Sequence, residues 1–202
     1  MKTTDSKEKI LDIALKLFVR RGYHGTSLND IARKAGLTKG GIYHYFSSKE
    51  DLYRQVLAKY FKEEGLPAWV MKTDQPIRDY IWSGFSWIER SKKEIQGLAG
   101  SKKDDVILCY YNFLYEATRK YPEFQRTIDT YDERKREWIT KAMQKAQAAG
   151  EIRADISTQA LAFELDALLQ QLQYLSFVNP QIKNNPEMFR TLFENYWLRL
   201  KA

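Results

Sequence analysis

The chain has 202 residues, of which 44% are hydrophobic and 29% charged, and its formal net charge is +7. This apolar content is enough for a folded core, and the single cysteine, Cys109, excludes an internal disulfide and any zinc site built on several cysteines. The sequence shows no apolar run of about 18 residues and no signal-peptide pattern, so we expect a cytoplasmic protein without a membrane partner.

The positive charge is concentrated at the start of the chain. Residues 1–60 hold twelve basic and six acidic side chains, a balance of +6, which leaves +1 for the remainder. A surface that binds a polyanion needs such an excess, although basic faces are also common as plain solvated surface. The charge therefore points to nucleic acid only together with a motif.

The first predicted element is an amphipathic helix over residues 7–21. Its apolar stripe consists of Ile10, Ile13, Ala14, Leu17 and Phe18. Gly22 is expected to end the helix, and His24 in the following loop is expected to be an ordinary surface residue.

Residues 26–49 are predicted to form two short helices joined by a tight turn. Ser27 can cap the first helix, with Asp30 at the spacing of a capping box, and Gly36 can end it in a left-handed conformation. Thr38 can then cap a second short helix, whose first turn contains Gly40 and Gly41. This arrangement predicts a helix-turn-helix.

The paired glycines cost a short helix about 1 kcal/mol each relative to alanine, so a close approach to another molecule is the expected compensation. In a helix-turn-helix the second helix lies in the DNA major groove. Lys49 would lie at the N-terminus of the next helix, which is an anion-binding position. The residues predicted to contact DNA are Thr26, Ser27, Thr38, Lys39, Gly40, Gly41, Tyr43, His44 and Lys49.

This region resembles the DNA-binding domain of the TetR (tetracycline repressor) family of bacterial transcriptional regulators. The resemblance runs from Ala14 to Leu52 and includes A-x-x-L-F-x-x-x-G-Y, ending at Tyr23, and K-G-G-I-Y-H-Y-F-S-S-K-E-D-L, beginning at Lys39. Many members carry His immediately before the Phe, whereas Tyr45 holds that place here and His44 precedes it. We interpret this departure as a matter of specificity.

The resemblance implies an all-α fold, with an N-terminal three-helix helix-turn-helix DNA-binding domain and a C-terminal helical ligand-binding and dimerisation domain. We place the DNA-binding domain at residues 1–48, a connector helix at 49–65 and the C-terminal domain at 66–202. Gly65 and Pro67 are expected to close the connector, and residues 66–76 to form an irregular linker with Trp69 and Met71 exposed or half-buried.

The remaining elements are predicted to be helices over residues 77–91, 104–120, 122–150, 157–177 and 186–200. A loop is expected through Gly97, Gly100 and Ser101. The helix over 104–120 is apolar or aromatic almost all the way round, which is typical of a central helix.

The last two helices are more apolar than one small domain would need. They resemble the paired helices with which TetR-type proteins form homodimers, and the alternative is that they complete the core of the single chain. The predicted interface residues are Leu161, Leu165, Leu168, Leu172, Leu175, Phe189, Phe193, Tyr196 and Trp197.

Together these observations predict a homodimeric regulator, most often a repressor in this family, that binds double-stranded operator DNA and is released by a small apolar or aromatic effector. A pocket for that effector is predicted at Trp82, Phe85, Tyr111, Tyr115, Glu116, Trp138 and Asp166, although aromatic residues at helical spacing are usually core. The alternative is a DNA-bound regulator or interaction module without a small ligand.

An enzyme is disfavoured by the residue inventory. The two histidines, His24 and His44, both fall in the DNA-binding region, so none is left to act as a base for Cys109 or a serine elsewhere. Metal-ligand spacings are missing as well. We therefore expect no catalytic residues, no metal and no cofactor.

Overall fold

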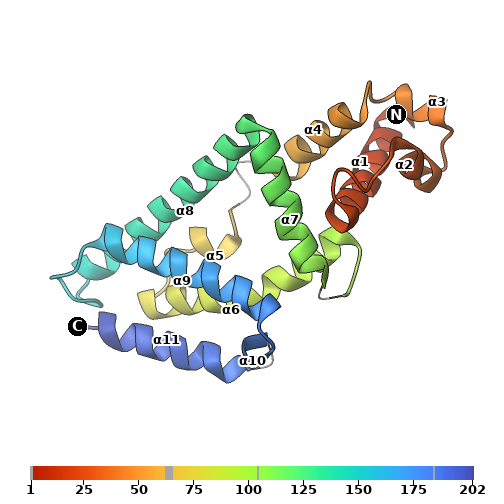
Figure 1. Cartoon of the computed structure of the whole chain (residues 1–202). Helices are drawn as coiled ribbons and strands as arrows, with labels where there is room; N and C mark the ends of the chain where they lie inside the picture. Colours follow the sequence, from red (N-terminus) through yellow and green to blue (C-terminus); the bar gives the residue numbers. More distant parts are fainter. Residues whose placement is uncertain (1, 62–65, 104, 184) are drawn as a thin grey trace. The chain divides into compact units, whose positions relative to one another are not determined.

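The computed structural model describes residues 2–61, 66–103, 105–183 and 185–202, and the described residues are helical throughout apart from their connecting segments (Figure 1). The helices are α1 (Lys2–Arg21), α2 (Leu28–Ala35), α3 (Lys39–Tyr43), α4 (Lys49–Tyr60), α5 (Ala68–Met71), α6 (Ile77–Ala99), α7 (Asp105–Lys120), α8 (Pro122–Ala148), α9 (Thr158–Val178), α10 (Pro180–Lys183) and α11 (Pro186–Leu200). The predicted all-α class is confirmed. Two predicted boundary residues, Gly65 and Asp104, lie outside the described residues.

The chain folds into two compact units. The first unit is formed by Met1–Lys62 and Lys93–Thr127, and the second by Glu63–Lys92 and Ile128–Ala202. The first unit thus contains α7 as well as the four N-terminal helices, whereas the predicted DNA-binding domain stops at residue 48. The functional division proposed from the sequence stays a prediction.

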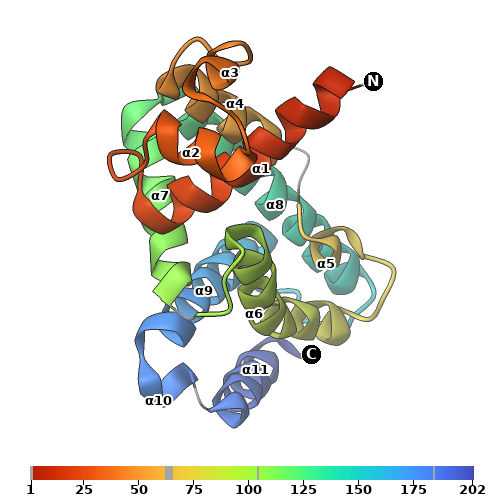
Figure 2. The same cartoon turned by 90° about the vertical axis from the view of Figure 1, so that its right-hand side faces the viewer.

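The core of the first unit is centred on α1, which packs against α2, α4 and α7 (Figures 1 and 2). Four residues of its predicted apolar stripe are buried, namely Ile10, Ala14, Leu17 and Phe18. Leu11, Leu15 and Val19 lie outside that stripe and are buried too. A helix surrounded by three others is covered on more than one face.

Aromatic rings join α4 and the residue after it to α7. The Tyr53 ring meets the edge of Phe18 at 4.8 Å and that of Phe113 at 5.4 Å between centroids. Phe61 lies 5.7 Å from Phe113 and 5.6 Å from Phe124. Helix α7, which the sequence predicts to be a central helix, buries Val106, Ile107, Phe113 and Ala117 but leaves Leu108 41% and Tyr115 62% exposed.

The second unit has its own hydrophobic core, built from α5, α6, α8, α9 and α11. The predicted irregular linker contains the short helix α5, and Trp69 on it is buried at 6% exposure rather than exposed or half-buried. Its ring packs against Tyr80, whose hydroxyl donates a hydrogen bond to the Val70 carbonyl at 3.0 Å. Met71 is 46% exposed, as expected.

Helix α6 is longer than predicted and continues through Gly97 to Ala99. Gly97 lowers helix propensity but does not have a left-handed backbone, and the buried Ile95 and Ala99 on either side of it anchor the last turns. The chain leaves the helix at Gly100, where φ is +59°.

Most residues of the predicted dimer seam lie inside the core of this chain. Leu161, Leu165, Leu172, Phe189, Phe193 and Tyr196 are all at most 7% exposed and belong to the core of the second unit. Their assignment to an interface is therefore corrected, because a side chain already covered by its own chain offers no surface to a second copy. Leu168, Leu175 and Trp197 are half-buried.

Candidate nucleic-acid interface

The first helix of the motif is held by the caps that its sequence predicts. The Asp30 backbone N–H donates to the Ser27 hydroxyl oxygen at 3.1 Å, and the Asp30 carboxylate accepts from the Ser27 backbone N–H at 3.4 Å. The hydrogen bond from the Ser27 hydroxyl is the first cause that lowers the pKa of Asp30. Gly36 ends α2 with φ 74° and ψ 28°, which is left-handed, so the capping box and glycine stop are confirmed.

The second helix, α3, begins at the cap Thr38, whose hydroxyl oxygen accepts from the Gly41 N–H at 3.1 Å. Ile42 and Phe46 are buried at 0% and 1% exposure and fix this segment to the core. The residues predicted to face DNA lie on the other side: Thr38, Lys39, Gly40 and His44 are exposed, and Tyr43 is 48% exposed.

Nothing within the described chain requires glycine at positions 40 and 41. Neither residue has a positive φ, and a Cβ on Gly40 would have only the Thr38 hydroxyl oxygen nearby, at 4.0 Å. A Cβ on Gly41 would meet the same oxygen at 3.4 Å, an ordinary contact. The two glycines therefore lower the stability of α3, and the packing of the chain gives no reason for them. The close approach of DNA to α3 would explain them.

Thr26 does not belong to the DNA-facing set. Its side chain is 1% exposed, and its single O–H is shared between the carbonyl oxygens of Leu17 at 3.2 Å and Gly22 at 3.0 Å. These bonds close the turn between α1 and α2. Ser27 is exposed, but its hydroxyl is engaged with Asp30 at 2.6 Å.

Lys49 has a structural role that the sequence did not reveal. Its ammonium donates to the carbonyl oxygens of Tyr23 at 2.9 Å and Thr26 at 3.0 Å, so it ties the start of α4 to the turn after α1. Burial, followed by the nearby Lys120, lowers the pKa of Lys49. An ammonium has three donors, so one remains for a phosphate, and DNA contact by Lys49 remains a proposal.

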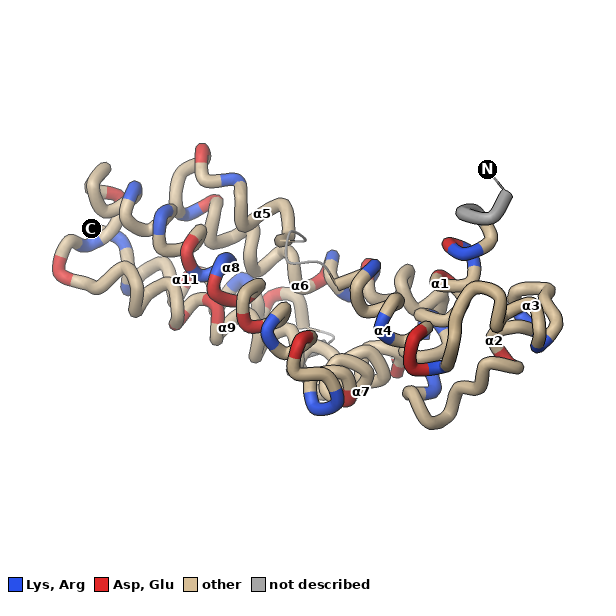
Figure 3. The backbone as a smooth tube through the Cα atoms, turned by 90° about the horizontal axis from the view of Figure 1, so that it is seen from above, with Lys and Arg blue, Asp and Glu red and all other residues tan. Residues whose placement is uncertain are grey.

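Basic positions occur along the backbone of both units (Figure 3). Several of those in the first unit are engaged by acidic neighbours: Arg33 pairs with Asp30 at 2.8 Å, and Lys59 pairs with Glu8 and Asp12. The Arg33 side chain is 80% exposed, and an exposed pair of this kind contributes little to stability, whereas Lys59 is half-buried between its two carboxylates.

The predicted effector-pocket residues fall in both units. Tyr111, Tyr115 and Glu116 lie on α7 in the first unit, whereas Trp82, Phe85, Trp138 and Asp166 lie in the second. Phe85 is a core residue at 2% exposure, and Trp82 packs on Phe193 at 5.0 Å. Asp166, at 5% exposure, is paired with Lys135 at 2.9 Å, which gives its buried charge a partner.

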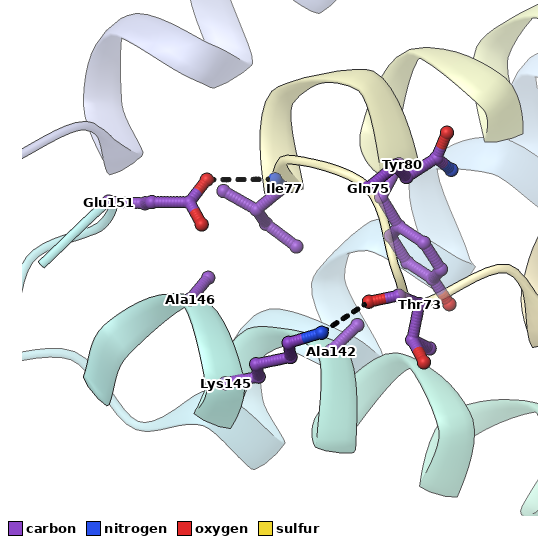
Figure 4. Close-up of a pocket in the computed structure, with 8 residues that line it drawn as sticks. All are labelled: Thr73, Gln75, Ile77, Tyr80, Ala142, Lys145, Ala146 and Glu151. Carbon is purple, nitrogen blue, oxygen red and sulfur yellow. Dashed lines mark hydrogen bonds between the residues drawn. The ribbon is translucent and has the colours of Figure 1, made fainter. Parts of the chain in front are cut away.

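A small cavity of about 20 Å³ lies in the second unit, where the start of α6 meets α8 (Figure 4). Two hydrogen bonds border it: Glu151 accepts from the Ile77 N–H at 2.9 Å, and Lys145 donates to the Thr73 carbonyl at 3.1 Å. This volume has room for about one water molecule. An organic ligand would have to move the surrounding side chains to enter.

These features define a class of protein. A capped α2, a tight glycine turn and a short α3 that exposes one polar, basic and aromatic face form a helix-turn-helix, and this is the geometry of a DNA-binding protein. None of the described helices is long and apolar enough to cross a membrane.

Comparisons with known proteins identify the family. Residues 10–56 match the model of bacterial regulatory proteins of the tetR family, and residues 109–182 match a tetracyclin repressor-like C-terminal domain. These two matches together span more than half of the chain. The protein belongs to the TetR family of transcriptional regulators.

Two curated relatives and one solved structure show how far the likeness extends. The negative regulator IcaR of Staphylococcus aureus (strain Newman) is 45% identical over 49 residues, 24% of this chain and 26% of IcaR. The regulator YfiR of Bacillus subtilis (strain 168) is 26% identical over 136 residues, 64% of this chain and 62% of YfiR. The chain thus matches less than two thirds of either relative.

The solved structure is a regulator from Saccharomonospora viridis in complex with choline. It has a TM-score of 0.74 at 18% identity and covers 99% of this chain and 100% of its own. At this identity the likeness shows a shared fold.

Proposed function

We propose that this protein is a homodimeric repressor that places α3 of each subunit in the major groove of a near-palindromic operator and is released by a small organic effector. The observation that carries the DNA contact is the exposed face of α3. Thr38, Lys39, Tyr43 and His44 point away from the core that Ile42 holds. Hydroxyl, ammonium and imidazole groups are the types that bind phosphates and base edges.

Dimerisation is supported by large apolar side chains that α9 and α11 leave exposed. They are Phe163 at 64%, Tyr174 at 45%, Met188 at 39% and Leu198 at 58%. A second copy related by a two-fold axis would cover these residues and would set the two α3 helices about 34 to 36 Å apart, one turn of DNA. The proposed interface thus uses the same helices as the sequence prediction but a different set of residues.

Repression is supported by the relative IcaR, whose name describes a negative transcriptional regulator. An effector is supported by the choline complex of the neighbouring structure. The sequence prediction of an apolar or aromatic effector rests on the aromatic helices. The small volume of the cavity in Figure 4 favours the alternative of a regulator without a ligand in the second unit.

Footprinting of the purified protein on the DNA that flanks its own gene tests the proposal. We expect two protected half-sites related by two-fold symmetry, with centres one helical turn or a multiple apart. Candidate effectors should remove the protection. A single half-site bound by one subunit would contradict the dimer, and protection unchanged by a broad effector panel would favour the ligand-free alternative.

A further inference from the structure

A second and larger cavity, of about 530 Å³, lies within the first unit. The turn after α1 contributes Tyr23 and His24 to its wall, and α4 contributes Tyr53. This volume is within the range of sites that bind small organic molecules. The cavity adjoins the turn that leads into the helix-turn-helix, and neither the DNA contact nor the proposed dimer uses it.

The opposite wall is one face of α7. Asn112, Glu116 and Lys120 are spaced four residues apart, so they lie one above another on the helix, with Tyr115 and Arg119 beside them. The Glu116 carboxylate is already engaged, because it accepts the Tyr23 backbone N–H at 3.2 Å. It holds the turn against α7 and keeps its negative charge in the wall, beside the Asn112 amide and the two cations Lys120 and Arg119.

Two cations of the cavity wall, Lys120 and Arg119, and the neighbouring Lys49 lie on aromatic rings of the wall. Lys120 Nζ lies 3.7 Å from the centroid of the Tyr23 ring, and Lys49 Nζ lies 4.1 Å from the same centroid. The Arg119 guanidinium lies 5.6 Å from the Tyr115 ring. A cationic ligand would have to compete for ring faces that three side chains of the protein already occupy, whereas an anionic ligand would find them as partners.

One buried polar group of the wall is unsatisfied. Tyr53 is 1% exposed, and within the described part of the chain its hydroxyl has no hydrogen-bond partner. Burial raises the pKa of Tyr53, so this hydroxyl is a proton donor at neutral pH. A buried donor without an acceptor is destabilising, and an acceptor in the cavity would relieve that cost.

We propose that this cavity is a binding site for a small aromatic anion, with the anionic group held by Lys120, Arg119 and the Tyr53 hydroxyl and the ring packed on the exposed ring of Tyr115. The occupant would contact both the turn that precedes α2 and the face of α7. Binding of such an anion to the protein without DNA is independent of the proposed function. Only an effect of the bound anion on operator affinity would rest on the proposed function.

Binding is tested on the full chain without DNA. Naphthalene carboxylate is titrated and followed by calorimetry, and naphthalene carboxamide serves as its neutral counterpart of the same shape. We expect saturable binding of the carboxylate and at least about tenfold weaker binding of the carboxamide, because charge-assisted hydrogen bonds are lost. Equal affinity for the two compounds, or no saturable binding of the carboxylate, would overturn the proposal.

Variants locate the site. Arg119→Ala and Tyr53→Phe should each weaken carboxylate binding several-fold, and Asn112→Trp should block binding by filling the cavity. The melting temperature of Tyr53→Phe should be unchanged or higher, because the substitution removes an unsatisfied hydroxyl. Lys141→Gln is the matched control, since it removes one cation from a tryptophan ring, 5.6 Å away, in the second unit. Normal binding by the folded Arg119→Ala, Tyr53→Phe and Asn112→Trp proteins would place the ligand elsewhere.

Discussion

The Lys49 ammonium donates a hydrogen bond to the Tyr23 carbonyl oxygen at 2.9 Å and lies 4.1 Å from the centroid of the ring of that same residue. Lys49 therefore holds both the backbone and the side chain of the turn between α1 and α2. A residue chosen from the sequence as a phosphate contact is also a structural support of the motif.

The two roles of Lys49 can be separated from each other by comparison with Lys39. Lys49→Ala should lower the free energy of unfolding by about 1 to 2 kcal/mol, because two charge-assisted hydrogen bonds are lost. Lys39→Ala, at an exposed position of α3, should leave unfolding unchanged, weaken binding to all DNA sequences similarly and reduce the salt slope of binding by about 1. Unchanged melting of Lys49→Ala would contradict its structural role.

Gly40→Ala is expected to act in opposite directions on stability and on DNA binding. The new methyl group has space within the chain, so the unfolding free energy should rise by up to about 1 kcal/mol from helix propensity. Operator affinity should fall at least about tenfold, because the methyl group would lie between α3 and the groove. Denaturant titration and fluorescence anisotropy measure the two effects, and full operator affinity in the variant would refute the close approach.

The proposed dimer face is tested by replacing its exposed apolar side chains with a charged one. Phe163→Glu and Leu198→Glu should give folded monomers in sedimentation velocity, because these side chains are exposed in the single chain and covered only by a second copy. Leu165→Glu should instead unfold the second unit, because Leu165 is 0% exposed. Leu108→Glu, on α7, is the control that should stay dimeric; a dimeric Phe163→Glu protein would rule out this face.

Two glycines of α6 should respond differently to alanine. A Cβ on Gly84 would lie 2.7 Å from the Leu169 side chain and 3.2 Å from the Trp69 ring, so Gly84→Ala should destabilise the protein by about 1 to 3 kcal/mol through overpacking. A Cβ on Gly97 has nothing within 4 Å, and Gly97→Ala should stabilise by up to about 1 kcal/mol. Chemical denaturation of both variants checks the pair, and a stable Gly84→Ala protein would show that α6 and α9 are less closely packed.

Asp51 should make the first unit sensitive to acid. Hydrogen bonds from the Gln55 side chain, and then from the Ser47 backbone N–H, lower the pKa of Asp51. A carboxylate with a lowered folded-state pKa contributes stability above its ordinary pKa, and this contribution is lost as the pH falls through the lowered value. Asp51→Asn should therefore cost about 1 kcal/mol at neutral pH and nearly nothing in strong acid. An equal cost at both pH values in urea titrations would contradict this role.

The helix-turn-helix could be predicted almost residue by residue, because its determinants are local. The bond between Ser27 and Asp30, the left-handed Gly36 and the Thr38 cap each act within about four residues, so their spacing in the sequence carries the geometry. Thr26 was misassigned because its hydroxyl bonds to Leu17, nine residues earlier, and that contact depends on how the chain turns back.

The covered faces of the last helices could not be predicted in the same way. Helix α9 carries apolar residues on several sides, and periodicity does not say which side meets the same chain. Leu161 and Leu165 are buried by their own chain, whereas Phe163, between them in sequence, is left outside. Trp69 was misjudged for a related reason, because a helix of four residues is too short to show a period.

The aromatic contacts of Tyr53 and Phe61 with Phe113 and Phe124 have a consequence for the order of events during synthesis. The ribosome makes the whole of the helix-turn-helix long before it makes α7, yet the core beneath α4 is completed only by these later rings. A nascent chain that ends before residue 113 would contain α2 and α3 but would have an incomplete core beneath α4. Expression of residues 2–61 alone would give a protein whose core beneath α4 lacks the same aromatic rings.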